Sequence, residues 1–147
     1  MKLTLTAKHL SLALAIFFVV TIFACKSDKG EVVVAAPEII RMVGVDMATG
    51  QCIMTDESGG SADTFKIDAG KKVQWLIQTN AIQDVTNIFK KSTSSNIFSE
   101  EPHRLGNSTT WEGTISSSAT GQEEDYNITW TDQAGATYLF DPKIQVK

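Results

Sequence analysis

Few residues in this chain of 147 are of types that could do chemistry together. His103 stands in a Glu-Glu-Pro-His-Arg run at residues 100–104, where a metal ion or acid–base catalysis would be the chemical interpretation. His9 is the only other histidine, so a solvated loop histidine is the simpler interpretation of His103. The acidic run at residues 123–125 lacks the alternating spacing and central glycine of a calcium loop. It predicts a charged entrance to a strand.

Motifs for nucleotide binding and nucleophilic catalysis are absent from the sequence. It contains no G-x-S-x-G, Walker or G-x-G-x-x-G run. Paired carboxylates for glycoside hydrolysis are not excluded, but a domain this small seldom forms the long cleft that glycan hydrolysis needs. We therefore expect no enzymatic activity and no cofactor. The 13 basic and 17 acidic side chains give a net charge of −4, which argues against nucleic acid as a partner.

The amino terminus differs in composition from the rest of the chain. Lys2 and Lys8 precede an uncharged apolar run of 15 residues at 10–24. A membrane-spanning helix needs about 20 such residues, so the run suits the core of a secretion signal better. It ends in Ile-Phe-Ala-Cys at residues 22–25, which resembles the lipobox of bacterial lipoprotein signal peptides.

The lipobox resemblance implies a lipid anchor. In that family the cysteine, here Cys25, receives a diacylglycerol, the peptide is cut before it, and the new amino terminus is acylated, as with palmitate. Phe23 departs from the small or aliphatic residue usual there, and a plain signal peptide or an uncleaved anchor is the alternative. The membrane would then be a partner through the lipid. Lys26, where an aspartate would favour inner-membrane retention, fits transport to the outer membrane.

We expect a signal peptide at residues 1–24, a tether at 25–37 and one domain at 38–147. From residue 38 onward, short strands recur every 8 to 12 residues between turn signals, which is typical of an all-β sandwich or small barrel. Residues 72–79 alternate apolar and polar positions, as in a half-buried strand. Residues 80–91 are expected to be a strand or irregular. Residues 90–107 are expected to be a long surface loop, anchored by Ile97 and Phe98.

The run at residues 64–75, TFKIDAGKKVQW, resembles the opening of a cupredoxin-like domain, and residues 124–128 resemble a later strand of that family. The resemblance implies a single antiparallel sandwich, cupredoxin-like or immunoglobulin-like. A blue-copper site takes two histidines, a cysteine and a weak axial ligand. Residues 127–132 offer no ligand pair and Cys52 precedes the Ala-Gly turn, so we expect no metal. Residues 138–146 resemble the end of uncharacterised Bacteroidetes envelope proteins. No particular activity follows from that resemblance.

Two tryptophans and one cysteine have both a packing and a functional interpretation. Cys52 is expected to share a strand face with Met54 and to pack in the core, and a reactive thiol is the alternative. Trp111 and Trp130 lie in strands with alternating apolar positions, so they are interpreted first as core. As a second interpretation they are binding platforms, because an exposed aromatic ring can stack on a sugar or a partner side chain.

The sequence therefore favours a lipid-anchored, non-catalytic protein of the cell envelope whose sandwich domain binds a protein or glycan. Trp111, Trp130 and His103 are the candidate binding residues. The alternative is a cupredoxin-derived protein of the periplasm that handles metal or electrons.

Overall fold

A computed structural model describes residues 35–147 of the chain. Ten strands and no helix occur within this range. The strands are β1 (Glu38–Asp46), β2 (Gln51–Thr55), β3 (Thr64–Ile67), β4 (Lys72–Ile77), β5 (Asp84–Lys90), β6 (Phe98–Arg104), β7 (Trp111–Ile115), β8 (Glu123–Thr131), β9 (Thr137–Phe140) and β10 (Lys143–Val146).

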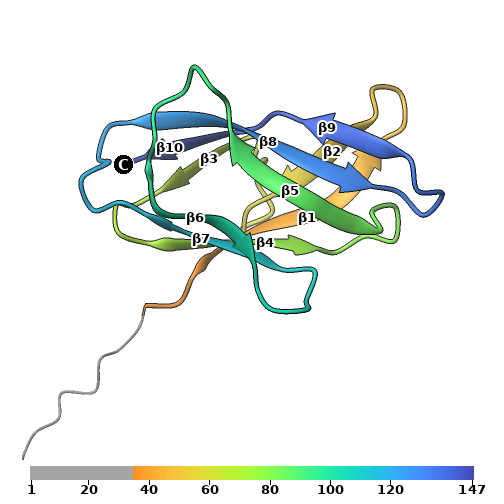
Figure 1. The fold of residues 1–147 in the computed structure, drawn as a ribbon, viewed down its shortest axis with the longest axis horizontal. Coiled ribbons are helices and arrows are strands. Elements are labelled where there is room, and N and C mark those ends of the chain that lie inside the picture. The colour runs from red at the N-terminus through yellow and green to blue at the C-terminus, as the bar shows by residue number, and fades with distance from the viewer. Residues whose placement is uncertain (1–34) are drawn as a thin grey trace, which may run out of the picture. The chain divides into compact units, whose positions relative to one another are not determined.

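The strands form two sheets that pack face to face (Figure 1). One sheet has the order β2-β1-β4-β7-β6, and the other has the order β3-β10-β8-β5, with β9 also paired to β8. The expected all-β sandwich is confirmed. The sheets approach each other along both sides, where β5 contacts β6 and β2 contacts β9.

The sheets are mixed rather than purely antiparallel. Most pairs are antiparallel, but β1 runs parallel to β4 and β10 runs parallel to β3. The expectation of an antiparallel sandwich was too simple because each parallel pair joins strands that are far apart in the chain. Turn signals between neighbouring strands carry no information on such pairs.

Alternation along the strands explains the core. In β4 the side chains of Val73 and Trp75 are buried, and in β8 those of Tyr126, Ile128 and Trp130 are buried. Successive residues of a strand face opposite sides of the sheet, so each run places one apolar face against the other sheet. The Trp75 indole donates a hydrogen bond to the Tyr126 hydroxyl at 3.1 Å, which gives each of these polar groups a partner inside the core.

Cys52 is a core residue, as expected. Its side chain is buried in β2 beside Met54, and burial raises the pKa of its thiol to about 12. The thiol is therefore protonated at neutral pH and unreactive as a nucleophile.

Two irregularities shape the ends of the sheets. The pairing of β1 with β2 shifts between Met42 and Gly44, and this bulge returns Val45 to the inner side, where it packs against the core. Asp141 and Pro142 separate β9 from β10, so that two short strands share one edge of β8. Proline has no backbone N–H to donate, which explains the break.

The expectation of a surface loop over residues 90–107 is wrong in part. Residues 98–104 form β6, which pairs with β7 although its register shifts twice. His103 therefore lies on an edge strand rather than in a loop. Ile97 and Phe98 are buried, as expected of an anchor. The sequence analysis missed this strand because its polar residues and Pro102 are typical of a loop. An irregular edge strand tolerates the same residues.

The acidic run at residues 123–125 begins β8, but only part of it is a charged surface. The side chain of Glu124 is 1% exposed and faces the core. Its Oε2 accepts a hydrogen bond from the Ile97 N–H at 3.0 Å, whereas Oε1 has no partner within the described residues. Alternation along β8 places Glu124 on the same face as Tyr126, which is the reason for its burial.

Candidate functional site

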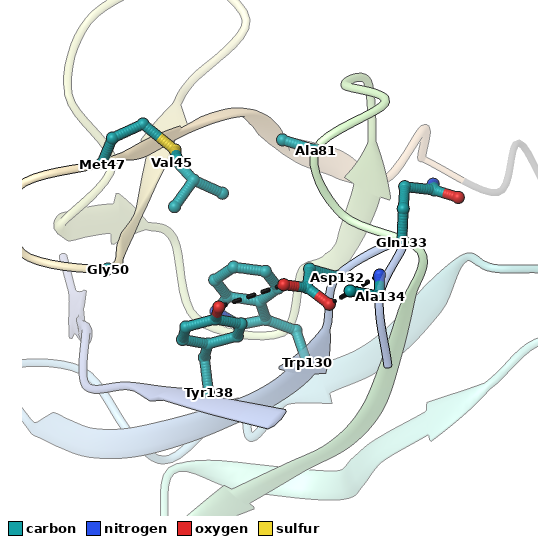
Figure 2. Close-up of a pocket in the computed structure, with 9 residues that line it drawn as sticks. All are labelled: Val45, Met47, Gly50, Ala81, Trp130, Asp132, Gln133, Ala134 and Tyr138. Carbon is teal, nitrogen blue, oxygen red and sulfur yellow. Dashed lines mark hydrogen bonds between the residues drawn. The ribbon is translucent and has the colours of Figure 1, made fainter. Parts of the chain in front are cut away.

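A pocket of about 370 Å³ lies at one end of the sandwich (Figure 2). Three connections meet there, namely the β1–β2 turn, the β4–β5 loop and the β8–β9 turn, which lie together at the right of Figure 1. The volume is within the range of about 300–1,000 Å³ that is common for ligand sites. The lining residues come from both sheets and all three connections: Val45, Met47, Gly50, Ala81, Trp130, Asp132, Gln133, Ala134 and Tyr138.

An aromatic pair forms one wall of the pocket. Trp130 of β8 and Tyr138 of β9 are direct cross-strand partners, and their rings stack with centroids 4.4 Å apart and planes 15° from parallel. Trp130 is 1% exposed, and its indole Nε1 is buried without a hydrogen-bond partner in the described part of the chain. The wall therefore presents mainly carbon surface to a ligand.

Asp132 organises the turn beside this wall. Its Oδ1 accepts hydrogen bonds from the N–H groups of Ala134 and Ala136, both at 2.9 Å. Its Oδ2 accepts one from the Tyr138 hydroxyl at 3.0 Å, shown as a dashed line in Figure 2. These bonds, led by the one from Ala136, hold the pKa of Asp132 below its usual value. The carboxylate is ionised at neutral pH and already takes three hydrogen bonds.

Gln133 closes the rim between two connections. Its side-chain amide donates a hydrogen bond to the Asn80 carbonyl at 3.1 Å, and the Gln83 N–H donates to the Thr131 carbonyl at 2.7 Å. The β4–β5 loop is thus fixed to the β8–β9 hairpin. The pocket is largely preformed, because its rim is held by internal hydrogen bonds.

A second carboxylate lies at the same end of the molecule. Asp46, between the lining residues Val45 and Met47, accepts hydrogen bonds at 2.9 Å from the Ala48 N–H and the Thr49 hydroxyl. These bonds, first the one from Ala48, lower the pKa of Asp46. The three connections at residues 46–50, 78–83 and 132–136 contain no lysine or arginine. The pocket end is therefore negatively charged.

Of the candidate binding residues named from the sequence, only Trp130 lines this pocket. Trp111 of β7 is buried at 7% exposure, its indole N–H donates to the Val85 carbonyl at 3.1 Å, and the Arg104 guanidinium lies 5.6 Å from its ring centre. The core interpretation is confirmed for both tryptophans.

His103 and Cys25 lie elsewhere. The His103 ring is partly exposed on β6, with Nδ1 3.1 Å from the Glu101 carbonyl oxygen and Nε2 3.8 Å from Glu100 Oε1. These two contacts are with residues of its own strand, its register partner across the pairing with β7 is Glu112, and it does not line the pocket. Cys25 lies outside the described residues.

Sequence reasoning missed most of the pocket, including Val45, Met47 and Ala81. One signal was available. The turn at residues 132–135 joins two strands, and pairing Thr131 with Thr137 places Trp130 opposite Tyr138. The other lining residues come from connections that only tertiary packing brings together.

The fold and pocket define a class: an all-β sandwich with a preformed, acidic and mainly apolar site at one end.

No known family model matches the chain, and no curated protein matches it significantly. Within residues 35–147, no group of three or more His, Cys, Asp or Glu side chains is placed to hold a metal ion. In the same range, no helix meets the length and hydropathy of a membrane span.

Proposed function

We propose that the chain is a lipid-anchored, non-catalytic protein of the bacterial cell envelope whose sandwich domain binds a protein or glycan partner at the end pocket. The pocket carries this proposal, because it is preformed, opens to solvent and is lined from both sheets. The lipobox at residues 22–25 supports the anchor, with Cys25 as the lipidated residue at the outer membrane. The cupredoxin-like or immunoglobulin-like type is part of the proposal, supported by β3, the turn at Gly70 and β4, which coincide with the residues that carry the resemblance.

The position of the pocket fits a tethered binding protein. The described chain enters the sandwich at Glu38, the first residue of β1, and the pocket lies where β1 ends at Asp46. A strand of nine residues spans about 30 Å at roughly 3.3 Å per residue. A partner at the pocket would bind well away from the point where the tether joins the domain.

Protease treatment of intact cells tests the proposal, with the wild type compared to Cys25→Ser. We expect the wild type to fractionate with membranes and Cys25→Ser to be released, because two or three acyl chains provide durable anchoring. Digestion in unbroken cells would place the domain at the cell surface, and digestion only after lysis would place it in the periplasm. If Cys25→Ser remains membrane-bound at the wild-type level, the lipoprotein assignment is wrong.

A further inference from the structure

We propose that the pocket receives a hydrophobic side chain from a protein partner, flanked by lysine or arginine, rather than a glycan. The inference rests on the proposed function and narrows its partner class. Three features of the pocket end carry it: the apolar lining, the hydrogen bonds already made by its polar groups, and the unbalanced negative charge.

The polar groups of the pocket are poorly suited to a sugar. A glycan brings many hydroxyl groups, and each one that loses water without gaining a partner costs about 1–3 kcal/mol. The Asp132 carboxylate already accepts three hydrogen bonds, and the Gln133 amide already donates to Asn80. The Trp130 ring is covered by Tyr138 and is nearly fully buried, so it offers no open face on which a pyranose could stack.

The same lining is well suited to an aliphatic or aromatic side chain. Val45, Ala81 and the Trp130–Tyr138 pair surround the space, and Figure 2 shows Val45 and Ala81 across the opening from the two rings. Met47 at the rim is 89% exposed. An exposed, flexible methionine adapts to the shape of an inserted group. A buried hydrophobic anchor surrounded by polar rim residues is the usual centre of a protein interface.

The negative charge of the pocket end favours basic residues on either side of the partner's hydrophobic side chain. Asp46 and Asp132 are held ionised by their turn hydrogen bonds, and the three connections around the pocket contain no cation. A partner with lysine or arginine beside its hydrophobic residue is attracted to this end, and an acidic partner is repelled. Such complementarity contributes mainly to specificity and association rate.

The three tryptophans of the chain allow a site-specific test by ¹⁹F NMR. The full-length protein, labelled with 5-fluorotryptophan, is placed in nanodiscs of uncharged phosphatidylcholine and titrated with the capped peptide Gly-Lys-Phe-Lys-Gly. The Trp130 signal, assigned with Trp130→Phe, should shift saturably, while the signals of Trp75 and Trp111 stay in place. Replacing the peptide's Phe with Ala should weaken binding at least tenfold, and replacing its two Lys with Glu should weaken it several-fold.

Variants of the protein separate the two contributions. Ala81→Phe fills the pocket opening from an exposed loop position without adding a fourth ¹⁹F signal and should abolish the Trp130 shift. Leu139→Ala, at an exposed position outside the pocket, should leave it unchanged. The double variant Asp46→Asn and Asp132→Asn should bind the Lys and Glu peptides equally. Unchanged positions of the Trp75 and Trp111 signals show that each variant is folded.

Each other outcome overturns the inference in a distinct way. If maltotriose shifts the Trp130 signal and the peptide does not, the domain is a glycan-binding module. If toluene binds and the peptide does not, the site takes a free apolar molecule. If the Phe and Ala peptides shift Trp130 with equal affinity, the pocket does not receive a hydrophobic side chain. If no probe shifts Trp130, the pocket is not the binding site. The Cys25→Ser fractionation tests the lipid anchor separately, so a negative result with the peptide would not contradict that part of the proposed function.

Discussion

Glu124 shows how a single buried side chain can make stability depend on pH. Burial is the main cause that raises the pKa of its carboxyl from 4.5 to about 7, and the hydrogen bond from the Ile97 N–H opposes this only in part. Among charged neighbours, Glu101 raises this pKa and Lys90 lowers it. The folded state therefore holds a proton that the unfolded chain releases near its ordinary pKa.

The stability that comes from this proton is fully present below about pH 4.5 and is lost as the pH rises through 7. We predict that the wild type becomes less stable from pH 5 to pH 8 by roughly 2–3 kcal/mol, which is most of the free energy equivalent to the pKa shift. Glu124→Gln, which cannot ionise, should be nearly constant over this range and more stable than the wild type at pH 8. Urea unfolding at several pH values measures both. Parallel pH profiles for the two proteins would contradict the assignment.

At the scale of the elements, β7 is held closely against β6 through a glycine. A Cβ on Gly113 would lie 2.9 Å from Phe98 Cε1 and 3.3 Å from the Glu100 carbonyl oxygen. Neither the backbone nor the buried Phe98 ring can move away without disturbing the packing of the sheet. The pairing of β6 with β7 thus depends on the absence of a side chain at this position.

We predict that Gly113→Ala destabilises the protein by about 1–3 kcal/mol, the usual cost of overpacking a core. Gly44→Ala is the matched control in β1, because its Cβ would meet Ile53 Cδ1 at an ordinary 3.5 Å. The control should change stability by less than about 0.5 kcal/mol. Thermal unfolding compares the two variants. Equal effects would show that the close approach to Phe98 is relieved without cost.

At the scale of the whole molecule, the last strand completes the second sheet. β10 lies between β3 and β8, and the side chains of Ile144 and Val146 are buried in the core. Its parallel pairing with β3 joins residues about 80 positions apart, so folding requires the end of the chain to return to its first half.

Deletion of residues 143–147 should therefore abolish cooperative unfolding and the near-ultraviolet circular dichroism of the tryptophans. Without β10, β3 loses its neighbour in the sheet and two buried apolar side chains are removed. Deletion of Lys147 alone removes only its N–H bond to the Ile67 carbonyl and an exposed ion pair with Asp68. That shorter deletion should preserve the transition. A folded protein lacking all of residues 143–147 would show that β10 is dispensable.

The sequence by itself determined the features that arise from neighbouring residues. Alternation in residues 72–79 predicted β4, in which Trp75 is buried, and the turn residues at 132–135 form the observed β8–β9 hairpin. Both follow from the period of two along a strand and the backbone preferences of turn residues. Together they were sufficient for the all-β class and the core positions of Cys52, Trp111 and Trp130.

Only the tertiary structure decided the parallel pairings, the burial of Glu124 and the pocket itself. The pocket unites Val45, Ala81 and Tyr138 from three separate connections or strands, and no local pattern relates them. Glu124 lies in a run of three acids whose composition indicates a surface, yet its position in the alternation of β8 turns it inward. Such features depend on contacts between residues distant in the chain, which local propensity does not encode.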